Sequence, residues 1–81
     1  MKNFDHLDLD GHALRLLLTV HEEGSITRAA QRLGLTQSAV SHGLDRLRDI
    51  VGDPLFVKSG RGIVATDQAG QLARRARTLL E

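Results

Sequence analysis

The sequence lacks most of the residue types that build disulfides, metal sites and aromatic platforms. Its 81 residues include no cysteine, tryptophan or tyrosine, one proline and two phenylalanines. Without cysteine, neither a disulfide framework nor a thiolate metal site can form. The scarcity of aromatic rings argues against binding of single-stranded nucleic acid by base stacking. A chain of this length predicts one small domain with a core barely sufficient for folding.

Long apolar segments are missing as well. No apolar run approaches the length that spans a bilayer. The N-terminal MKNFDHLDLD is too acidic and too poor in apolar residues for a signal peptide. We therefore expect a cytoplasmic protein without membrane contact, in which residues 1–8 form a loose lead-in.

No catalytic or metal-binding pattern is present. Ser41, His42 and Asp45 have the side chains of a catalytic triad, but neighbouring helical positions point about 100° apart and cannot pair as nucleophile and base. The four histidines show no metal-ligand pairing. Gly60 and Gly62 belong to an expected hairpin rather than to a phosphate-binding loop. We expect no enzyme activity, no metal and no cofactor.

Positive charge is concentrated in the middle of the chain. Residues 1–24 carry two basic and five acidic side chains, a net charge of −3, whereas residues 25–65 carry six and three, a net charge of +3. Residues 66–81 have a net charge of +1. This division predicts a surface that binds a polyanion and an acidic surface behind it.

Apolar periodicity predicts the order helix, helix, helix, hairpin, helix. The helical stripes repeat at intervals of three and four residues, as expected for one buried face each. They comprise Leu14, Leu17, Leu18 and Val20, then Ile26, Ala29, Ala30 and Leu33, then Val40, Leu44, Leu47 and Val51. The expected elements are helices over residues 10–23, 26–33 and 36–51, strands over 55–58 and 63–65, and a helix from 67 to the chain end.

Helix ends are marked by residues that favour caps. Ser25, Thr36 and Thr66 each precede an expected helix and offer an N-cap hydroxyl. Gly24 and Gly34 follow the first two helices, where a left-handed residue is needed. The second and third helices are thus joined by a tight turn, as in a helix-turn-helix. The whole order predicts a mainly α, winged helix-turn-helix followed by one further helix.

The first turn of the third helix carries short polar side chains that packing does not require. Hydroxyl and amide groups there can reach base edges in the major groove, and Gln37 can pair bidentately with adenine. We expect base contacts from Gln37, Ser38, Ser41 and His42. The alternative is a solvated first turn in which Thr36 only caps the helix.

Phosphate-binding residue types flank this helix. At the start of the second helix, backbone amides and a cation can hold a phosphate, although Ser25 there is better explained as a plain cap. Arg61 lies between two glycines at the tip of the wing, where it can enter a narrow A·T-rich minor groove or remain a solvated turn charge. The expected phosphate contacts are Thr27, Arg28, Thr36 and Lys58.

The last helix has a larger apolar face than so small a core is expected to cover. Pairing with the same helix of a second chain is the favoured explanation, because alanine and leucine permit close packing. Folding back onto the core and fraying are the alternatives. The expected dimer contacts are Ala69, Leu72, Ala73, Ala76, Leu79 and Leu80.

The combined motifs resemble the N-terminal domain of LysR-type transcriptional regulators. The resemblance is carried by EGSI at residues 23–26, RAA at 28–30, TQSAVSH at 36–42, LF at 55–56 and RG at 61–62. It implies a winged DNA-binding domain over residues 1–65 and a dimerisation helix over residues 66–81, and it covers nearly the whole chain from residue 9.

The resemblance also implies partners. These are a double-stranded DNA operator, an interrupted palindrome for a two-fold dimer in a bacterial nucleoid, and a second copy of the chain. A small-molecule effector would bind a further domain, so the chain is expected to be a fragment of a longer regulator.

Four positions depart from the common family pattern. Ser38 replaces a frequent proline, His42 replaces arginine or lysine, and Lys58 replaces arginine. Gly43 replaces glutamine inside a helix, which costs about 1 kcal/mol relative to alanine. Gly43 thus indicates a close approach, either to DNA or to another helix. Leu35 is expected to fill the corner between the second and third helices.

Two other functions fit the same fold. A winged-helix protein-interaction module would use the last helix and never touch DNA, but the charge division and the polar first turn of the third helix argue against it. An RNA-binding winged helix is disfavoured because the major groove of A-form RNA is too narrow for a reading helix.

Overall fold

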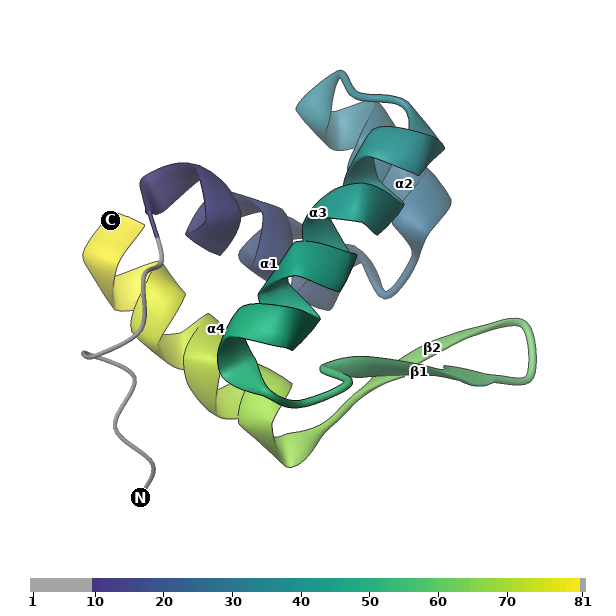
Figure 1. The fold of residues 1–81 in the computed structure, drawn as a ribbon. Coiled ribbons are helices and arrows are strands. Elements are labelled where there is room, and N and C mark those ends of the chain that lie inside the picture. Colours follow the sequence, from purple (N-terminus) through teal and green to yellow (C-terminus); the bar gives the residue numbers. More distant parts are fainter. Residues whose placement is uncertain (1–9, 81) are drawn as a thin grey trace.

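The computed structural model describes residues 10–80 as four helices and a two-stranded antiparallel sheet (Figure 1). This confirms the predicted winged helix-turn-helix with a further helix. The expected lead-in, residues 1–8, lies outside the described residues. The elements are α1 (Gly11–Glu23), α2 (Ile26–Leu33), α3 (Gln37–Val51), β1 (Phe56–Ser59), β2 (Gly62–Ala65) and α4 (Asp67–Leu80).

The predicted caps define the helix ends. The Ser25, Thr36 and Thr66 hydroxyl oxygens accept hydrogen bonds from the backbone N–H groups three residues later, at 3.2, 3.0 and 3.1 Å. Gly34 has a φ of 70° and its N–H bonds to carbonyls of the last turn of α2. The tight turn between α2 and α3 is therefore encoded locally, by one glycine and one threonine.

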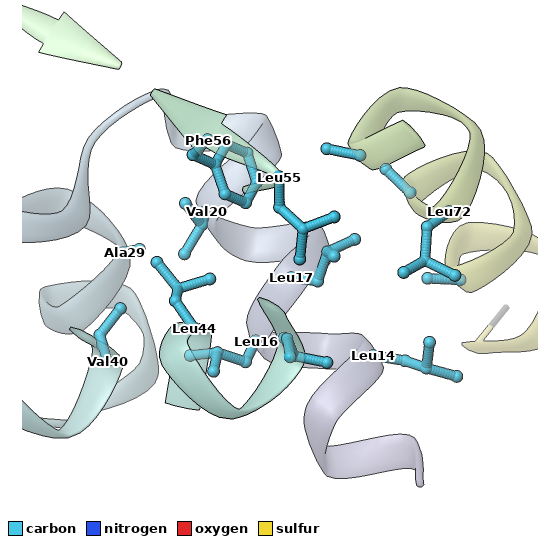
Figure 2. Close-up of a cluster of buried hydrophobic side chains, with 14 of the residues drawn as sticks. Leu14, Leu16, Leu17, Val20, Ala29, Val40, Leu44, Leu55, Phe56 and Leu72 are labelled. Carbon is cyan, nitrogen blue, oxygen red and sulfur yellow. The ribbon is translucent and has the colours of Figure 1, made fainter. Parts of the chain in front are cut away.

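Helix α1 is the centre of the fold, because α2, α3 and α4 all contact it. Leu17 is fully buried, and in Figure 2 it lies among side chains from α3, the wing and α4, including Leu44, Leu55 and Leu72. The predicted stripes are confirmed at Leu14, Leu17, Val20, Ala29, Ala30, Val40, Leu44, Leu47 and Val51, while Leu18, Ile26 and Leu33 are only partly buried.

Helix α4 folds back onto the core, which corrects the expectation that its apolar face lacks a partner within the chain. Ala69, Leu72, Ala73 and Ala76 are buried against the same chain, so they cannot also form a dimer surface. The alanines allow α4 to lie close to α1, so the small core does cover this face. Leu80 packs partly against the core, and Leu79 remains 67% exposed.

The wing, formed by β1 and β2, is joined to the core through a backbone conformation at Leu55 that the sequence did not indicate. Leu55 is fully buried and has a φ of 65°, the one positive value among non-glycine residues of the described chain. Its neighbours close a γ-turn, in which the Phe56 N–H donates to the Pro54 carbonyl at 2.7 Å. The Asp53 carboxylate accepts from the Leu55 N–H at 2.8 Å and from the Thr66 hydroxyl at 2.7 Å. These bonds tie the start of the wing to its end.

The structure shows which surface lies close to Gly43. A Cβ built at this position would overlap the Leu16 Cδ2 atom more closely than real Cβ atoms approach any heavy atom. The close approach is therefore between α3 and α1. Leu16, which lay outside the predicted stripe of α1, is buried at this seam.

Three helices are also joined by an exposed ion-pair network. Glu22 at the end of α1 lies 2.8 Å from Arg32 of α2 and 2.9 Å from Arg77 of α4, and Arg32 also lies 3.2 Å from Glu23. The hydrogen bond from Arg32 lowers the pKa of the Glu22 carboxyl; partial burial opposes this effect and Arg77 adds to it.

Substitution of Gly43 in α3 and of Gly70 in α4 should have opposite effects on stability. Gly70→Ala should raise the free energy of unfolding by about 0.5–1 kcal/mol, since alanine favours helix and the nearest atom to the new Cβ, Arg74 Nη1, is 3.9 Å away. Gly43→Ala should bring no gain, because Leu16 must move. Urea denaturation measures both. An equal gain in the two variants would show that the α1–α3 seam is not close-packed.

The Glu22 network predicts a pH-dependent contribution to stability. Because the folded-state pKa of Glu22 is lowered, the contribution is present above the ordinary glutamate pKa and is lost as pH falls through the folded value. Glu22→Gln should therefore lower the melting temperature at neutral pH and have little effect near pH 3. Asp49→Asn, which changes an exposed carboxylate outside the network, is the matched control. A Glu22→Gln effect that persists at pH 3 would contradict an ionic origin.

Candidate nucleic-acid interface

The exposed face of α3 carries the predicted base-contacting residues. Gln37, Ser38 and His42 are exposed, and Ser41 is partly exposed. At 100° per residue, Ser38 and His42 lie on the side of the helix opposite Val40 and Leu44, which are fully buried. The polar first turn is therefore presented outward by the packing of the apolar stripe.

Thr36 and Ser25 cap helices through their hydroxyl oxygens and can still donate a hydrogen bond. The Thr36 and Ser25 oxygens accept bonds from backbone amides, which leaves each O–H free to donate. A phosphate oxygen beside Thr36 could accept such a bond. Ser25 is confirmed as the N-cap of α2.

The N-terminal turn of α2 offers a second group of donors. Thr27 and Arg28 are exposed there, and Arg28 makes no ion pair with any residue in the described part of the chain. The positive end of a helix dipole and a free guanidinium together favour an anion.

The wing projects away from the helices as a narrow ribbon (Figure 1). Strands β1 and β2 pair from Phe56 opposite Ala65 to Ser59 opposite Gly62, one residue later in β1 than predicted because Leu55 has left-handed backbone geometry. Gly60 has a φ of 59°, which permits the tight turn at the tip. Lys58 and Arg61 are both exposed on this ribbon.

Arg48 fixes the wing relative to α3, a role that the sequence did not reveal. Its Nε donates to the Pro54 carbonyl at 2.7 Å, its Nη1 pairs with Asp45 at 2.7 Å, and its Nη2 lies 3.5 Å from the Phe56 carbonyl oxygen. Nothing in the sequence distinguishes Arg48 from Arg46 as the arginine that makes these contacts.

The arginines thus fall into two sets. Arg32 and Arg77 join helices through the Glu22 carboxylate, and Arg48 pairs with Asp45 of its own helix and joins α3 to the wing through backbone carbonyls. Arg28 and Arg61 make no such pair among residues 10–80 and keep their charge for an external anion. These two flank the polar face of α3 in the sequence, one on α2 and one on the wing.

Other types of site are not found in the described chain. Residues 10–80 contain no group of three or more histidine, cysteine, aspartate or glutamate residues able to hold a metal ion. No helix in this range is long and apolar enough to cross a membrane.

Sequence comparison identifies relatives among bacterial regulators. Residues 12–70 match the family model of the bacterial regulatory helix-turn-helix proteins of the lysR family. The transcriptional activator AmpR of Rhodobacter capsulatus is 42% identical over 64 residues, which are 79% of this chain and 22% of AmpR. AbaB of Streptomyces antibioticus is 44% identical over 68 residues, 84% of this chain and 23% of AbaB. The chain therefore spans less than a quarter of each relative.

Solved structures show the same fold. The probable transcriptional regulator PA0477 from Pseudomonas aeruginosa superposes with a TM-score of 0.84 at 32% identity, over 89% of this chain and 24% of PA0477. The BenM DBD bound to catB site 1 DNA gives a TM-score of 0.83 at 28% identity, over 89% and 81% of the two chains. The CbnR DBD–DNA complex gives 0.82 at 28% identity, over 89% and 83%.

Removal of the Arg48 contacts should loosen the wing. In Arg48→Lys, the single ammonium cannot hold Asp45 and two carbonyls together, so amides of β1 and β2 should exchange about tenfold faster with deuterium. Arg46→Lys changes a neighbouring arginine that makes no hydrogen bond or ion pair with the wing within residues 10–80, and it serves as control. Equal exchange rates in the two variants would show that Arg48 does not hold the wing.

Proposed function

The chain belongs to the lysR family of bacterial regulatory helix-turn-helix proteins, and we propose that it binds specific sites in double-stranded DNA as part of a transcription regulator. The observation that carries this proposal is the exposed polar first turn of α3, which lies in the sequence between Arg28 and Arg61, two arginines without an ion pair among residues 10–80. Two structural relatives, the BenM and CbnR domains, were solved as DNA complexes, which supports the same role here.

In the proposed complex, α3 enters the major groove. Gln37, Ser38, Ser41 and His42 contact bases from its exposed face. The phosphate contacts come from Thr27, Arg28, Thr36 and Lys58. Arg61 at the wing tip enters a flanking minor groove, where a narrow A·T-rich segment has the most negative potential.

We further propose that the regulator binds as a homodimer on an interrupted palindrome, since two-fold protein symmetry requires a two-fold site. With four α4 residues buried in their own chain, the contact would involve Leu79, which is 67% exposed, and the adjacent Leu80. The relatives are more than four times longer than the matched region, so sensing of a small-molecule effector is proposed only for a further domain. The setting is the cytoplasm, at the nucleoid.

The direct test is selection of bound sequences from a random duplex library at two salt concentrations. We expect enrichment of an interrupted palindrome with A·T-rich flanks. Binding should weaken with salt with a log–log slope of about −0.9 per phosphate neutralised. Recovery of unselected DNA would show a generic cationic surface, and no recovery would favour a module for protein partners.

Charge reversal locates the interface. Arg28→Glu and Arg61→Glu should each lower affinity for the selected DNA at least tenfold and reduce the salt slope, because each removes one phosphate or minor-groove contact. Arg74→Glu, an exposed arginine on α4, is the matched control. Unchanged affinity in both test variants would refute the proposed DNA-binding face.

A further inference from the structure

A hollow of about 490 Å³ lies on the seam between α1 and α3, beside the turn that joins α2 to α3. We name it the α1–α3 groove. Its apolar lining consists of Leu16, Leu33, Leu35, Ala39 and Gly43. A hollow of this size is within the range of sites for small organic molecules.

Gly43 and Leu35 give the groove its apolar character. Gly43 has no side chain to extend along the seam, and the smaller neighbouring hollow of about 120 Å³ shares Gly43 and Leu16 with it. Leu35, which the sequence placed in the corner between helices, is instead 40% exposed at the groove wall. Packing within the described chain therefore leaves this large apolar side chain open to solvent.

The charged lining of the groove is entirely basic. His12 and Arg15 approach from α1, and His42 and Arg46 from α3, while no acidic residue lines this hollow among the described residues. Arg15 and Arg46 make no ion pair with any residue of the described chain, unlike Arg32, Arg48 and Arg77. Two unpaired guanidinium groups beside an apolar surface can bind a carboxylate through paired N–H donors.

We propose that the α1–α3 groove binds a small organic carboxylate with an apolar, aromatic-sized body. The body would rest on Leu16, Leu35 and Ala39, and the carboxylate would lie between Arg15 and Arg46. Among residues 10–80 no carboxylate lines the groove, which disfavours an organic cation, and the apolar floor disfavours inorganic phosphate, which has no apolar surface to bury.

Binding in the groove would also weaken DNA binding, a consequence that rests on the proposed function. Ala39 and His42 belong both to the groove lining and to the exposed side of α3. A carboxylate there adds negative charge beside the surface that would face phosphates. The DNA-binding domain would thus respond directly to an organic acid.

The groove is tested first without DNA, with 2-naphthoate as the probe and 2-naphthylmethanol as its neutral counterpart. The chain contains no tryptophan or tyrosine, so naphthyl fluorescence anisotropy is measured against almost no protein signal. We expect 2-naphthoate to bind about tenfold more tightly than the alcohol. Amide shifts in an NMR titration should centre on Leu16, Leu35, Ala39 and Gly43.

Variants separate the groove from other cationic surfaces. Arg15→Gln and Arg46→Gln change exposed side chains and should each weaken 2-naphthoate binding severalfold, whereas Arg74→Gln on α4 should not. Equal binding of the neutral probe, equal weakening by Arg74→Gln, or amide shifts elsewhere would overturn the proposal. So would an absence of probe binding at millimolar concentration, or groove amides that respond only to self-association, which would assign the surface to a second copy.

The proposed effect of groove binding on DNA binding is tested in a separate experiment. In a titration with 2-naphthoate, the Kd for the selected DNA should rise severalfold, and Arg15→Gln should need severalfold more 2-naphthoate for the same rise. Probe binding with unchanged DNA affinity would overturn the coupling alone. Failure of DNA binding would refute the proposed function while leaving the probe titration of the free chain as a test of the groove.

Discussion

The placement of the wing depends on Leu55, a buried leucine held at a φ of 65°. Such a conformation costs about 1–3 kcal/mol in a non-glycine residue and persists only where its surroundings fix it. Here the Leu55 side chain is fully buried, and Asp53 bonds to both its N–H and the Thr66 hydroxyl. Chain direction changes sharply at this point, so that β1 leaves the core and β2 returns beside it.

The same junction connects the two ends of the candidate interface. Arg48 of α3 reaches the carbonyls of Pro54 and Phe56 on either side of Leu55, and Thr66 begins α4. Movement of the wing would therefore disturb bonds to both α3 and α4. In the proposed DNA complex, α3 and the wing must keep a fixed separation to enter adjacent grooves together, and these bonds would hold that separation.

Local chemistry made much of the fold predictable. Ser25, Gly34 and Thr36 act through hydrogen bonds within a few residues, and the period of apolar residues reports directly which side of each helix is buried. The order of elements and the exposed face of α3 followed from these signals. The proposed contact residues on that face follow from side-chain type, and their partners lie outside the chain.

Features that depend on contacts between distant residues were not predictable. Leu55 begins a segment that favours a strand, and its left-handed backbone geometry is held by Asp53, which bonds both to the Leu55 N–H and to Thr66. Gly43 indicated a close approach, but only the packing of Leu16 against it identified α1 as the partner. Helix α4 presented one apolar face that suits either a second chain or its own core, and periodicity cannot distinguish the two.

The distribution of arginines extends this distinction from fold to function. The sequence alone does not show which carboxylate an arginine will pair with, because surface ion pairs contribute little to stability and can form between many partners. In the structure, three arginines neutralise carboxylates and join elements, whereas Arg28, Arg61, Arg15 and Arg46 lack such partners in the described chain. The first two flank the polar face of α3 in the sequence, and the last two line an apolar groove. Free cations on two chemically different surfaces are suited to two different anions, a phosphate backbone and an organic carboxylate.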